Sequence, residues 1–399
     1  MSQPPILIIG AGISGLALAQ GLKQSTIPFH VYESDPTPAF RPQGYRFRVN
    51  PVGATALQGL LSGEQWARFE KVCAQAPLMG GRFNALNGEP LVSPFGTGPP
   101  PGTRGGGKSY TADRTATRDL LLRGLDGEVS FGKRCVGYEV SEEGVTAFFE
   151  DGSHAPGAFL VGAEGVRSVV RKQYLPKLKI LDTDCRCIYG KTKISKELLE
   201  RTSDALLKGL TVLVDGSRGS SLILLFEAIK FQDNDLRSEL PDDYVYWVLG
   251  SIKEDFEKPD HELLHLSGPE VADLTLKITE KWLPSLRAVL ELQERDMTSA
   301  LRISMASPDM AAWESSGKVA LIGDAAHVMP PTGGVGANIA MQDAAALFKV
   351  LSTGISRETI SGYEEELRRR GREAILGSAR GGKHLLGMRD WETFEAYEP

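Results

Sequence analysis

Short, strongly apolar runs recur near both ends of the chain and predict buried strands. Residues 6–9, 159–162 and 319–322 are almost wholly apolar, and residues 29–33 form a further strand-like run. Continuous apolar runs of this length are typical of parallel strands that are buried on both faces. A helical pattern spans residues 13–23, between the first two of these runs along the chain. This alternation predicts a doubly wound unit built around a parallel sheet.

The middle of the chain has a different pattern. Residues 210–214, 221–231 and 244–252 are longer strand-like runs, and turn residues at 215–217 and 241–243 separate them. Such runs predict an antiparallel sheet, and hence a second domain inserted between pieces of the first.

From residue 342 onwards the pattern is mostly helical, and Gly371, Gly381 and Gly382 are expected to interrupt it. A chain of 399 residues also exceeds what one hydrophobic core usually supports, so two interleaved domains are expected. The predicted fold class is therefore α/β, with a Rossmann-type domain, an inserted antiparallel-sheet domain and C-terminal helices.

Composition and charge exclude several classes of function. The net charge of −6 offers no electrostatic basis for binding nucleic acid. Four cysteines are too few for a disulfide framework in a chain of this length, which predicts reduced thiols and a cytoplasmic protein. The apolar stretch at residues 6–22 lacks a preceding basic region and is too short for a membrane span.

The first candidate site is the turn after the first strand. Its sequence fits G-x-G-x-x-G, with a strand before it and a helix after it. Gly10 permits the tight turn, Gly12 lets the backbone approach a pyrophosphate, and Gly15 lets the helix pack close to the sheet. The phosphate charge would face the helix N-terminus, at Ile13 and Ser14.

Glu33 ends the second strand, where a carboxylate can accept hydrogen bonds from the adenosine ribose. An acid at this point repels a 2′-phosphate, so we expect the nucleotide not to be NADP. The turn alone does not distinguish NAD from FAD. The alternative is a glycine-rich turn beside a solvated acid.

A second candidate segment follows the run at residues 319–322. Asp324, after Gly323, can accept a hydrogen bond from a polyol hydroxyl at the carboxyl end of a strand. Pro330 and Pro331 predict a stiff wall without donors. The glycines that follow permit close approach of the backbone to a flat ring, and a helix begins near Ala337 and Asn338. These glycines are Gly333, Gly334 and Gly336.

With this segment the sequence resembles the FAD-dependent aromatic-hydroxylase family, the single-component class A flavin monooxygenases related to salicylate and para-hydroxybenzoate hydroxylases. In that family the Gly-Asp segment binds the ribityl chain, and the Pro-Thr-Gly-Gly stretch lines the isoalloxazine ring. The matching residues are Gly323, Asp324, His327, Pro331, Gly334, Gly336, Asn338 and Asp343. Non-covalent FAD is the implied cofactor.

Two further segments resemble family signatures. The run VGAEGVRSVVR at residues 161–171 has Glu164 and Gly165 where the family usually has Asp-Gly, and Arg167 and Arg171 match. The family's cofactor-contacting arginine is matched by Arg114, at the start of a predicted helix over residues 114–125.

The resemblance also implies a domain organisation. The FAD-binding domain is expected to comprise residues 1–75, 103–178 and 298–350. The substrate domain is expected to comprise residues 76–102 and 179–297, and a C-terminal helical segment to cover residues 351–399.

The implied reaction needs NAD(P)H as co-substrate and O2, and it transfers one oxygen atom to the substrate. The inserted sheet, whose strands are apolar, suits a hydrophobic small molecule. The expected function is hydroxylation or epoxidation of an aromatic or polycyclic compound, in secondary metabolism. The alternatives are a flavin oxidase, dehydrogenase or reductase, and a non-catalytic flavin-binding redox sensor.

No catalytic base stands out in the sequence. Arg46 and Arg48 lie two apart on a predicted strand, so both side chains share a face and can point at flavin or substrate. Surface charge on an edge strand is the alternative. Tyr110, Tyr189 and Tyr246 are alternative hydrogen-bonding partners, and we expect His327 to be structural.

Two other motif matches do not fit their chemistry. His261-Glu262-Leu263-Leu264-His265 fits H-E-x-x-H, but Val271 stands where the extended motif needs a third histidine, and we predict no metal. Residues 102–109 fit G-x-x-x-x-G-K-[ST], but three prolines precede them in place of a buried strand.

Overall fold

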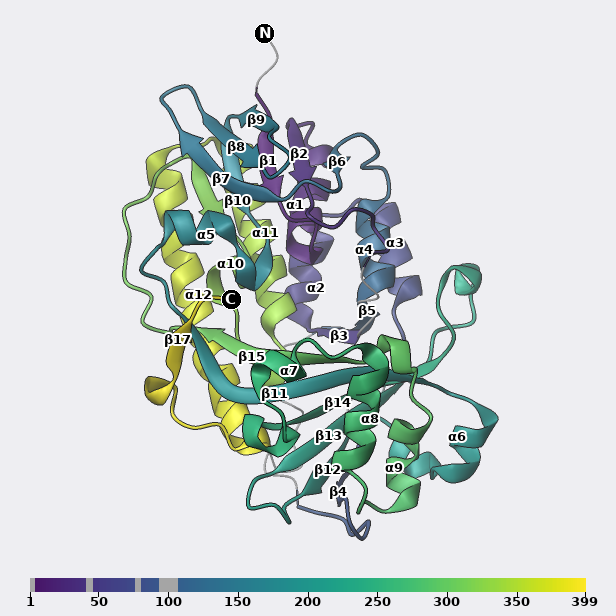
Figure 1. Cartoon of the computed structure of the whole chain (residues 1–399). Helices are drawn as coiled ribbons and strands as arrows, with labels where there is room; N and C mark the ends of the chain where they lie inside the picture. The colour runs from purple at the N-terminus through teal and green to yellow at the C-terminus, as the bar shows by residue number, and fades with distance from the viewer. Residues whose placement is uncertain (1–3, 41–45, 76–79, 93–106) are drawn as a thin grey trace.

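The computed structural model describes residues 4–40, 46–75, 80–92 and 107–399. Figure 1 shows an α/β part at the top and a large sheet with its own helices below it. The two parts are connected by several crossings of the chain, so neither is a continuous stretch of sequence.

A five-stranded parallel sheet forms the centre of the α/β part, in the order β16-β10-β1-β2-β6. All four residues of β1 and β10 are buried, as expected of strands that are covered on both faces. The strands are β1 (Ile6–Ile9), β2 (Phe29–Tyr32), β6 (Val129–Ser130), β10 (Phe159–Gly162) and β16 (Val319–Leu321).

Helices and a small sheet cover this parallel sheet. α1 (Ile13–Gln24) packs against α11 (Gly336–Thr353) and α4 (Arg114–Leu122). The residues of a three-stranded antiparallel sheet, which the sequence did not predict, share the same hydrophobic core. Its strands are β7 (Cys135–Val140), β8 (Val145–Phe149) and β9 (His154–Gly157).

The lower part is a seven-stranded, mostly antiparallel sheet in the order β15-β11-β14-β13-β12-β4, with β17 also paired to β11. β15 lies in a segment that we assigned to the FAD-binding domain, yet its hydrogen bonds place it in this sheet. The predicted domain boundaries stay a prediction. The strands are β4 (Arg82–Asn84), β11 (Ile180–Lys193), β12 (Thr211–Asp215), β13 (Leu222–Ile229), β14 (Tyr244–Ile252), β15 (Ser299–Ala306) and β17 (Glu395–Tyr397).

The two faces of the large sheet differ. One face packs on its own helices around Phe226, Trp247 and Leu249, in a separate hydrophobic core. The other face is turned toward the α/β part and packs against Met329 and Ile375. The covering helices are α6 (Lys196–Arg201), α7 (Asp260–Leu263), α8 (Gly268–Ile278) and α9 (Pro284–Glu291).

Two short strands, β3 (Arg46–Val49) and β5 (Tyr110–Asp113), pair with each other where the two parts of the molecule meet. α2 (Pro51–Gln58) and α3 (Gly63–Val72) follow β3. Asn50 caps α2, because its side chain accepts a hydrogen bond from Gly53 N. The cap fixes the direction in which the chain leaves β3.

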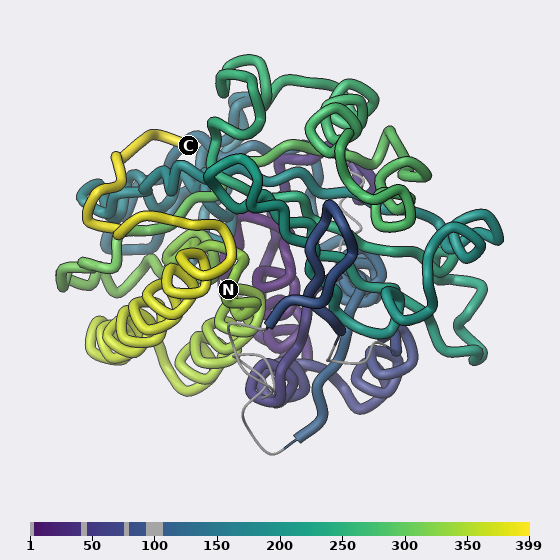
Figure 2. Tube along the Cα trace, turned by 90° about the horizontal axis from the view of Figure 1, so that it is seen from below, coloured from purple at the N-terminus to yellow at the C-terminus, as the bar shows by residue number. Residues whose placement is uncertain are grey.

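The C-terminal pattern was partly misread. α12 (Arg357–Leu386) is one continuous helix of 30 residues, and the three glycines lie inside it. They serve close packing: a methyl group built on Gly371 would lie 3.0 Å from His327 Cβ, and one on Gly381 would lie 3.1 Å from Thr332 O. Figure 2 shows α12 and α11 side by side. Within the described residues, no helix has both the length and the hydrophobicity that crossing a bilayer requires.

Candidate functional site

The turn between β1 and α1 is shaped by its glycines. Gly10 has φ +108°, and a methyl group built there would lie 2.5 Å from the carbonyl oxygen of Ala163. One built on Gly15 would lie 2.2 Å from Gly10 O. On Gly12 it would meet nothing within 4 Å among the described atoms. Since no described side chain caps α1, the turn presents an open helix N-terminus, which favours an anion.

Glu33 lies beside this turn, where the sequence predicts a ribose contact. Its Oε2 accepts a hydrogen bond from Ala11 N at 2.9 Å, and its Oε1 accepts one from Asp35 N at 2.9 Å. The carboxylate therefore also holds the turn in shape, a role that the sequence did not indicate.

Arg118 is a candidate residue that sequence reasoning missed. Its Nε donates to Ala11 O at 3.0 Å, and its Nη2 lies 3.9 Å from Glu33 Oε2. We assigned the cofactor arginine to Arg114, which is exposed one turn earlier at the start of α4. Arg118 precedes the buried Leu121 by three residues, so both lie on the same face of α4. This spacing was the signal in the sequence that Arg118 faces the protein. A contact between Arg114 and FAD stays a prediction, whereas Arg118 already adjoins the turn.

The Gly-Asp segment lies next to the same turn. Only β10 separates β16 from β1, and parallel strands present their carboxyl ends at one edge of a sheet. A methyl group built on Gly323 would lie 3.1 Å from Ser14 Oγ, so the two segments are in contact. Asp324 is exposed although Gly323 and Ala325 are buried. The structure thus brings together the two glycine-bearing segments that we predicted to hold one cofactor.

A buried ionic cluster supports this segment from behind. Asp343 Oδ2 accepts hydrogen bonds from Gly323 N at 3.0 Å and His327 Nε2 at 2.5 Å, and its Oδ1 accepts one from Arg370 Nη2 at 3.0 Å. Burial lowers the pKa of His327, but the charge of Asp343, its hydrogen bond and the charge of Asp324 together outweigh this effect and leave the pKa above its ordinary value. His327 is fully buried in this cluster, where it supports the backbone.

The predicted ring-facing loop is an open surface. Pro331 and Gly334 are exposed, and Gly336 and Ala337 are half-buried. Gly334 has φ +62° and no described atom within 4 Å of where a methyl group would stand. A flat ring can therefore approach this backbone closely.

Asn338 differs from the residues of this loop because its side chain is hydrogen-bonded to other parts of the protein. Its Oδ1 accepts from Asn50 N at 2.8 Å, and its Nδ2 donates to Arg48 O at 2.8 Å. It therefore anchors the end of β3 to α11, and only its backbone is left for the predicted cofactor contact.

These residues fit FAD. Gly12 and Gly334 leave cradles that any side chain would fill, and the exposed Asp324 lies between Gly323, in contact with the turn, and the loop. A phosphate at the first cradle, a polyol at the carboxylate and a flat ring at the second cradle match the order of groups in FAD.

Arg46 and Arg48 do share a face, but they are not surface charges. Both reach the buried carboxylate of Glu227 on β13, with Arg46 Nε 2.8 Å from Oε2 and Arg48 Nη2 2.5 Å from Oε1. Only 13% of each arginine side chain is exposed. Burial lowers the pKa of Arg48, and the charge of Glu227 opposes this shift. Glu227 is a second residue that the sequence analysis missed, because nothing local relates positions 46, 48 and 227.

A row of partly exposed apolar side chains crosses the sheet beside this triad. Val212, Leu225, Val248 and Tyr189 are register partners on four adjacent strands. Each is half-buried, although the strands belong to the middle of the sheet. Three of them, and Val335 of the ring-facing loop, pack against the same buried hydrophobic cluster. The row is therefore an incompletely covered apolar surface opposite the predicted flavin position.

The tyrosines we considered divide into two groups. Tyr110 OH donates to Glu70 Oε1 at 2.7 Å, which ties it to α3. Tyr246 lies on β14, where its ring is 5.2 Å from Arg46 Cζ and 6.1 Å from the ring of Tyr189. Tyr189 is thus part of the apolar row, and Tyr246 lies beside both Tyr189 and Arg46.

Glu164, where the family signature has aspartate, takes a structural position. It accepts hydrogen bonds from Ser168 Oγ at 2.6 Å and Val170 N at 3.1 Å, and desolvation raises its pKa. Arg171 is buried and donates to Val166 O at 2.7 Å, whereas Arg167 is exposed. This segment therefore supports the start of α5 (Val169–Tyr174).

The two other motif matches have ordinary surroundings. His261 is 79% exposed at its side chain, and His265 Nδ1 lies 3.1 Å from His261 O. In the part of the chain that the structure describes, no three histidine, cysteine, aspartate or glutamate side chains are grouped to hold a metal ion. Most of the other match, residues 102–106, lies outside the described residues. Lys108, near its end, pairs with Glu70 at 3.1 Å.

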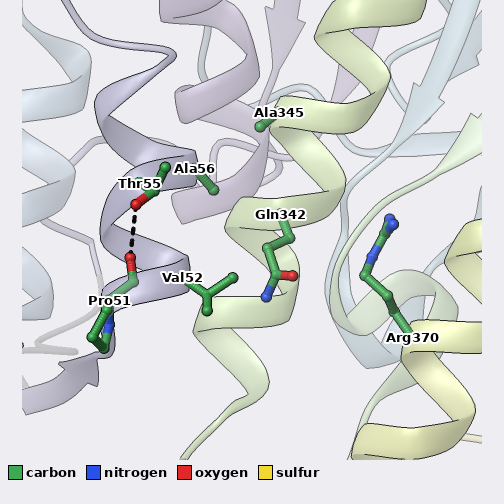
Figure 3. A pocket seen from close by; sticks show the side chains of 7 residues that line it. All are labelled: Pro51, Val52, Thr55, Ala56, Gln342, Ala345 and Arg370. Carbon is green, nitrogen blue, oxygen red and sulfur yellow. Dashed lines mark hydrogen bonds between the residues drawn. The ribbon is translucent and has the colours of Figure 1, made fainter. Parts of the chain in front are cut away.

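A surface groove of about 460 Å³ lies between α2, α11 and α12 (Figure 3). It contains none of the residues that we predicted to bind the cofactor. Its lining residues are Pro51, Val52, Thr55, Ala56, Gln342, Ala345 and Arg370.

Two protein-family matches cover the two glycine-bearing segments of the candidate site. Residues 8–69 match an NAD(P)-binding Rossmann-like domain, and residues 285–378 match a FAD binding domain. A dual O-methyltransferase/FAD-dependent monooxygenase, elcB of Phaeosphaeria nodorum, is 39% identical over 99% of this chain and 47% of its own length. The FAD-dependent monooxygenase thnD of Trichoderma harzianum is 29% identical over 87% of this chain and 82% of its own. The chain is therefore similar to FAD-dependent monooxygenases over most of its length.

Two solved structures share the fold of this chain. A protein from Photorhabdus luminescens, described as a FAD containing monooxygenase, has a TM-score of 0.79 and 27% identity, covering 96% of this chain and 99% of its own. A salicylate hydroxylase in complex with substrate has the same fold, with a TM-score of 0.71, 20% identity, and coverage of 98% and 90%. The chain spans about half the length of the dual-function relatives, including those from Cercospora.

The two family matches coincide with the two distant segments of the candidate site. The first family match contains the turn at Gly10–Gly15 and Glu33, and the second contains the Gly-Asp segment and Arg370. The two matched regions thus lie toward opposite ends of the chain, and each contains one of the two predicted cofactor-binding segments.

Proposed function

We propose that the chain is a FAD-dependent monooxygenase that uses NAD(P)H and O2 to hydroxylate or epoxidise an aromatic or polycyclic hydrophobic compound in secondary metabolism. For hydroxylation, a substrate C–H bond becomes C–OH, the second oxygen atom leaves as water, and NAD(P)H supplies the two electrons. Bound FAD would supply the oxygen chemistry. The protein would bind and orient the substrate and exclude water from the site.

The residues that would hold FAD lie along one edge of the parallel sheet. The turn at Gly12, with Ile13 and Ser14, would receive the pyrophosphate, and Glu33 the ribose. Asp324 would accept a hydrogen bond from the ribityl chain, and the loop from Pro331 to Ala337 would line the ring. Arg118 would add a positive charge beside the pyrophosphate.

The apolar row across the large sheet is the observation that carries the proposal. Four half-buried apolar side chains in the middle of a sheet are unusual unless a ligand covers them. Neighbouring strands are about 4.8 Å apart, so four strands span roughly 14 Å. This width suits a flat compound with more than one fused ring.

Several of the relatives have two activities in their names, and this chain spans about half of the length of each. We therefore assign to it only the monooxygenase activity. The FAD-binding and substrate domains would be those predicted from the sequence, with β15 shared between them.

The test uses the purified chain loaded with FAD. Candidate polycyclic phenols are screened for faster NAD(P)H consumption, and the product is then formed under 18O2. One labelled oxygen atom per product molecule supports the proposal. Substrate oxidation without label would indicate an oxidase or dehydrogenase, and flavin binding without any substrate-stimulated consumption would indicate a redox sensor.

A matched pair of variants tests the apolar row. Leu225→Asp places a charge in the row and should abolish substrate-stimulated NAD(P)H consumption. Lys230→Asp, on an exposed position just after the same strand, should leave it unchanged. Equal activity in both variants would contradict the placement of the substrate.

A further inference from the structure

The buried carboxylate of Asp343 connects the Gly-Asp segment to the C-terminal helix. Its Oδ2 accepts a hydrogen bond from Gly323 N at 3.0 Å, and its Oδ1 accepts one from Arg370 Nη2 at 3.0 Å. With 0% of the Asp343 side chain exposed, both oxygens depend on partners inside the protein. One carboxylate thus binds the backbone directly before Asp324 and a side chain of α12.

The guanidinium of Arg370 has few other contacts. Within the described residues, its Nη2 makes its one hydrogen bond, to Asp343, and its buried Nε has no partner. Glu366, one turn earlier on α12, is exposed and pairs with Arg369 at 2.8 Å. His327 bonds the other oxygen of Asp343, Oδ2, at 2.5 Å. Arg370 and Asp343 are therefore each other's partners at Oδ1.

Arg370 should control the orientation of this carboxylate. The last side-chain torsion of an aspartate is broad, so the carboxylate turns easily unless both oxygens are held. Without Arg370, Oδ1 would lose its partner, and a buried charged atom without a partner is costly. The carboxylate would then reorient around His327, whose bond to it is the shorter one. The hydrogen bond from Gly323 N would weaken, and the backbone at Asp324 would lose its support.

The surface groove between α2, α11 and α12 gives access to Arg370 from solvent. Arg370 is one of its lining residues, and Figure 3 shows the side chain extending from α12 beside α11. Only 15% of this side chain is exposed. Shortening it would therefore leave a hole that opens into the groove. A groove of about 460 Å³ is large enough for a guanidinium ion to enter.

Resting on the proposed function, we propose that Arg370 is a positioning residue for the flavin half of FAD. By fixing the carboxylate of Asp343, it holds Gly323 and Asp324 in the place where Asp324 meets the ribityl chain.

The adenosine half of the cofactor should depend on other groups. The turn at Gly10–Gly15 is held by Glu33, which accepts from Ala11 N, and by Arg118, which donates to Ala11 O. Loss of Arg370 should therefore weaken binding of the flavin part and leave binding of the ADP part nearly unchanged.

The first experiment compares FAD with ADP, which carries the adenosine and pyrophosphate but no ribityl chain. Arg370→Met fills the space of the side chain but removes its charge and its donors. It should weaken FAD binding about tenfold or more, the effect of losing a hydrogen bond to a charged group. It should change ADP binding by no more than about twofold. Arg369→Met, at the next position on the helix, is the control and should alter neither affinity in calorimetry.

The second experiment tests charge by chemical rescue. Arg370→Ala should lose FAD affinity to a similar extent, and guanidinium chloride at millimolar concentration, well below its denaturing range, should restore most of it. Sodium chloride at the same ionic strength should not. Arg370→Met should show no rescue, because its side chain fills the hole.

Each outcome bears on the inference. Equal losses of FAD and ADP affinity in Arg370→Met, or no loss of either, would show that Arg370 only clamps α12. Selective loss without rescue of Arg370→Ala would trace the effect to packing and would also overturn the inference. If Arg370→Ala does not fold, the ratio of FAD to ADP affinity in Arg370→Met decides alone. Wild-type protein that binds FAD but not ADP overturns it too, whereas failure to bind FAD would refute the proposed function itself.

Discussion

At the scale of single residues, a substitution at Gly12 should affect cofactor binding without affecting folding. Its backbone has φ −77° and ψ 179°, which any residue adopts, and no described atom would touch an added methyl group. Gly12→Ala should therefore leave the unfolding free energy of the FAD-free protein within about 0.5 kcal/mol of wild type. It should weaken FAD binding at least tenfold, because the methyl group would stand where the phosphate approaches. Fluorescence titration with FAD checks the affinity, and equal affinities would contradict the placement of the pyrophosphate.

His327 gives a pH-dependent contribution to stability. Its pKa in the folded protein is raised above the unfolded value, because the charge and hydrogen bond of Asp343, with the charge of Asp324, together outweigh burial. The stabilisation is therefore fully present below about pH 6.5 and is lost as the pH rises through the raised pKa. His327→Gln should cost about 1.5 to 3 kcal/mol at pH 6 and less at pH 9. Urea unfolding at both pH values measures this, and a cost that grows with pH would be the opposite of the expectation.

The cysteines should be unreactive in the folded chain. All four are free and buried, and burial raises the pKa of Cys135 to about 11 and those of Cys185 and Cys187 to about 12. At pH 8 at most about one thiol in a thousand would then be ionised. A thiol reagent should detect almost none in the native protein and four in denaturant. Rapid labelling of the native protein would contradict the described burial.

Residues whose role depends on the local backbone were predictable from the sequence, whereas residues paired across the fold were not. The turn at Gly10, Gly12 and Gly15 can be recognised from the sequence, because the spacing of its glycines and their backbone freedom alone define it. Arg118 and Glu227 act through groups that the sequence places far away. Only the three-dimensional pairing of their segments identifies them.

At the scale of elements, the glycines of α12 show how packing can override helix propensity. Gly371 faces His327 Cβ, whereas Gly362 in the same helix has no described atom within 4 Å of an added methyl group. Gly362→Ala should stabilise the protein by about 0.5 to 1 kcal/mol. Gly371→Ala should destabilise it by about 1 to 3 kcal/mol, because the buried His327 cannot move away. Thermal unfolding of both variants checks the sign, and stabilisation by Gly371→Ala would contradict the close contact.

The elements missed by sequence analysis are those with charges inside strands or irregular exposure. β11 runs for 14 residues but contains Arg186, which is buried between Asp182 and Asp260. Such a charged stretch does not resemble a central strand until its partners are known. β7 mixes buried and exposed residues without regular alternation, with Val136 and Val140 exposed, and is a weak signal by itself. The parallel strands β1 and β10 were predicted because burial on both faces requires unbroken apolar runs.

At the scale of the whole molecule, the proposed cofactor would join segments from both ends of the chain. FAD should therefore raise the melting temperature more than either half of the cofactor does. At a free concentration one hundred times its dissociation constant, FAD would add about 2.7 kcal/mol to the unfolding free energy. ADP and FMN, at the same concentration, should each give a much smaller shift. A shift with ADP equal to that with FAD would show that the ring-facing loop does not take part.

The large sheet also has a consequence for how the chain reaches its native state. β4 pairs with β12 and β11 pairs with β15, so residues near 82 meet residues near 212, and residues near 186 meet residues near 302. Contacts this distant in sequence form slowly, because long loops must close first. During synthesis, the edge of β11 that pairs with β15 would stay open until β15 emerges from the ribosome. This interval is when the nascent chain is most exposed to aggregation.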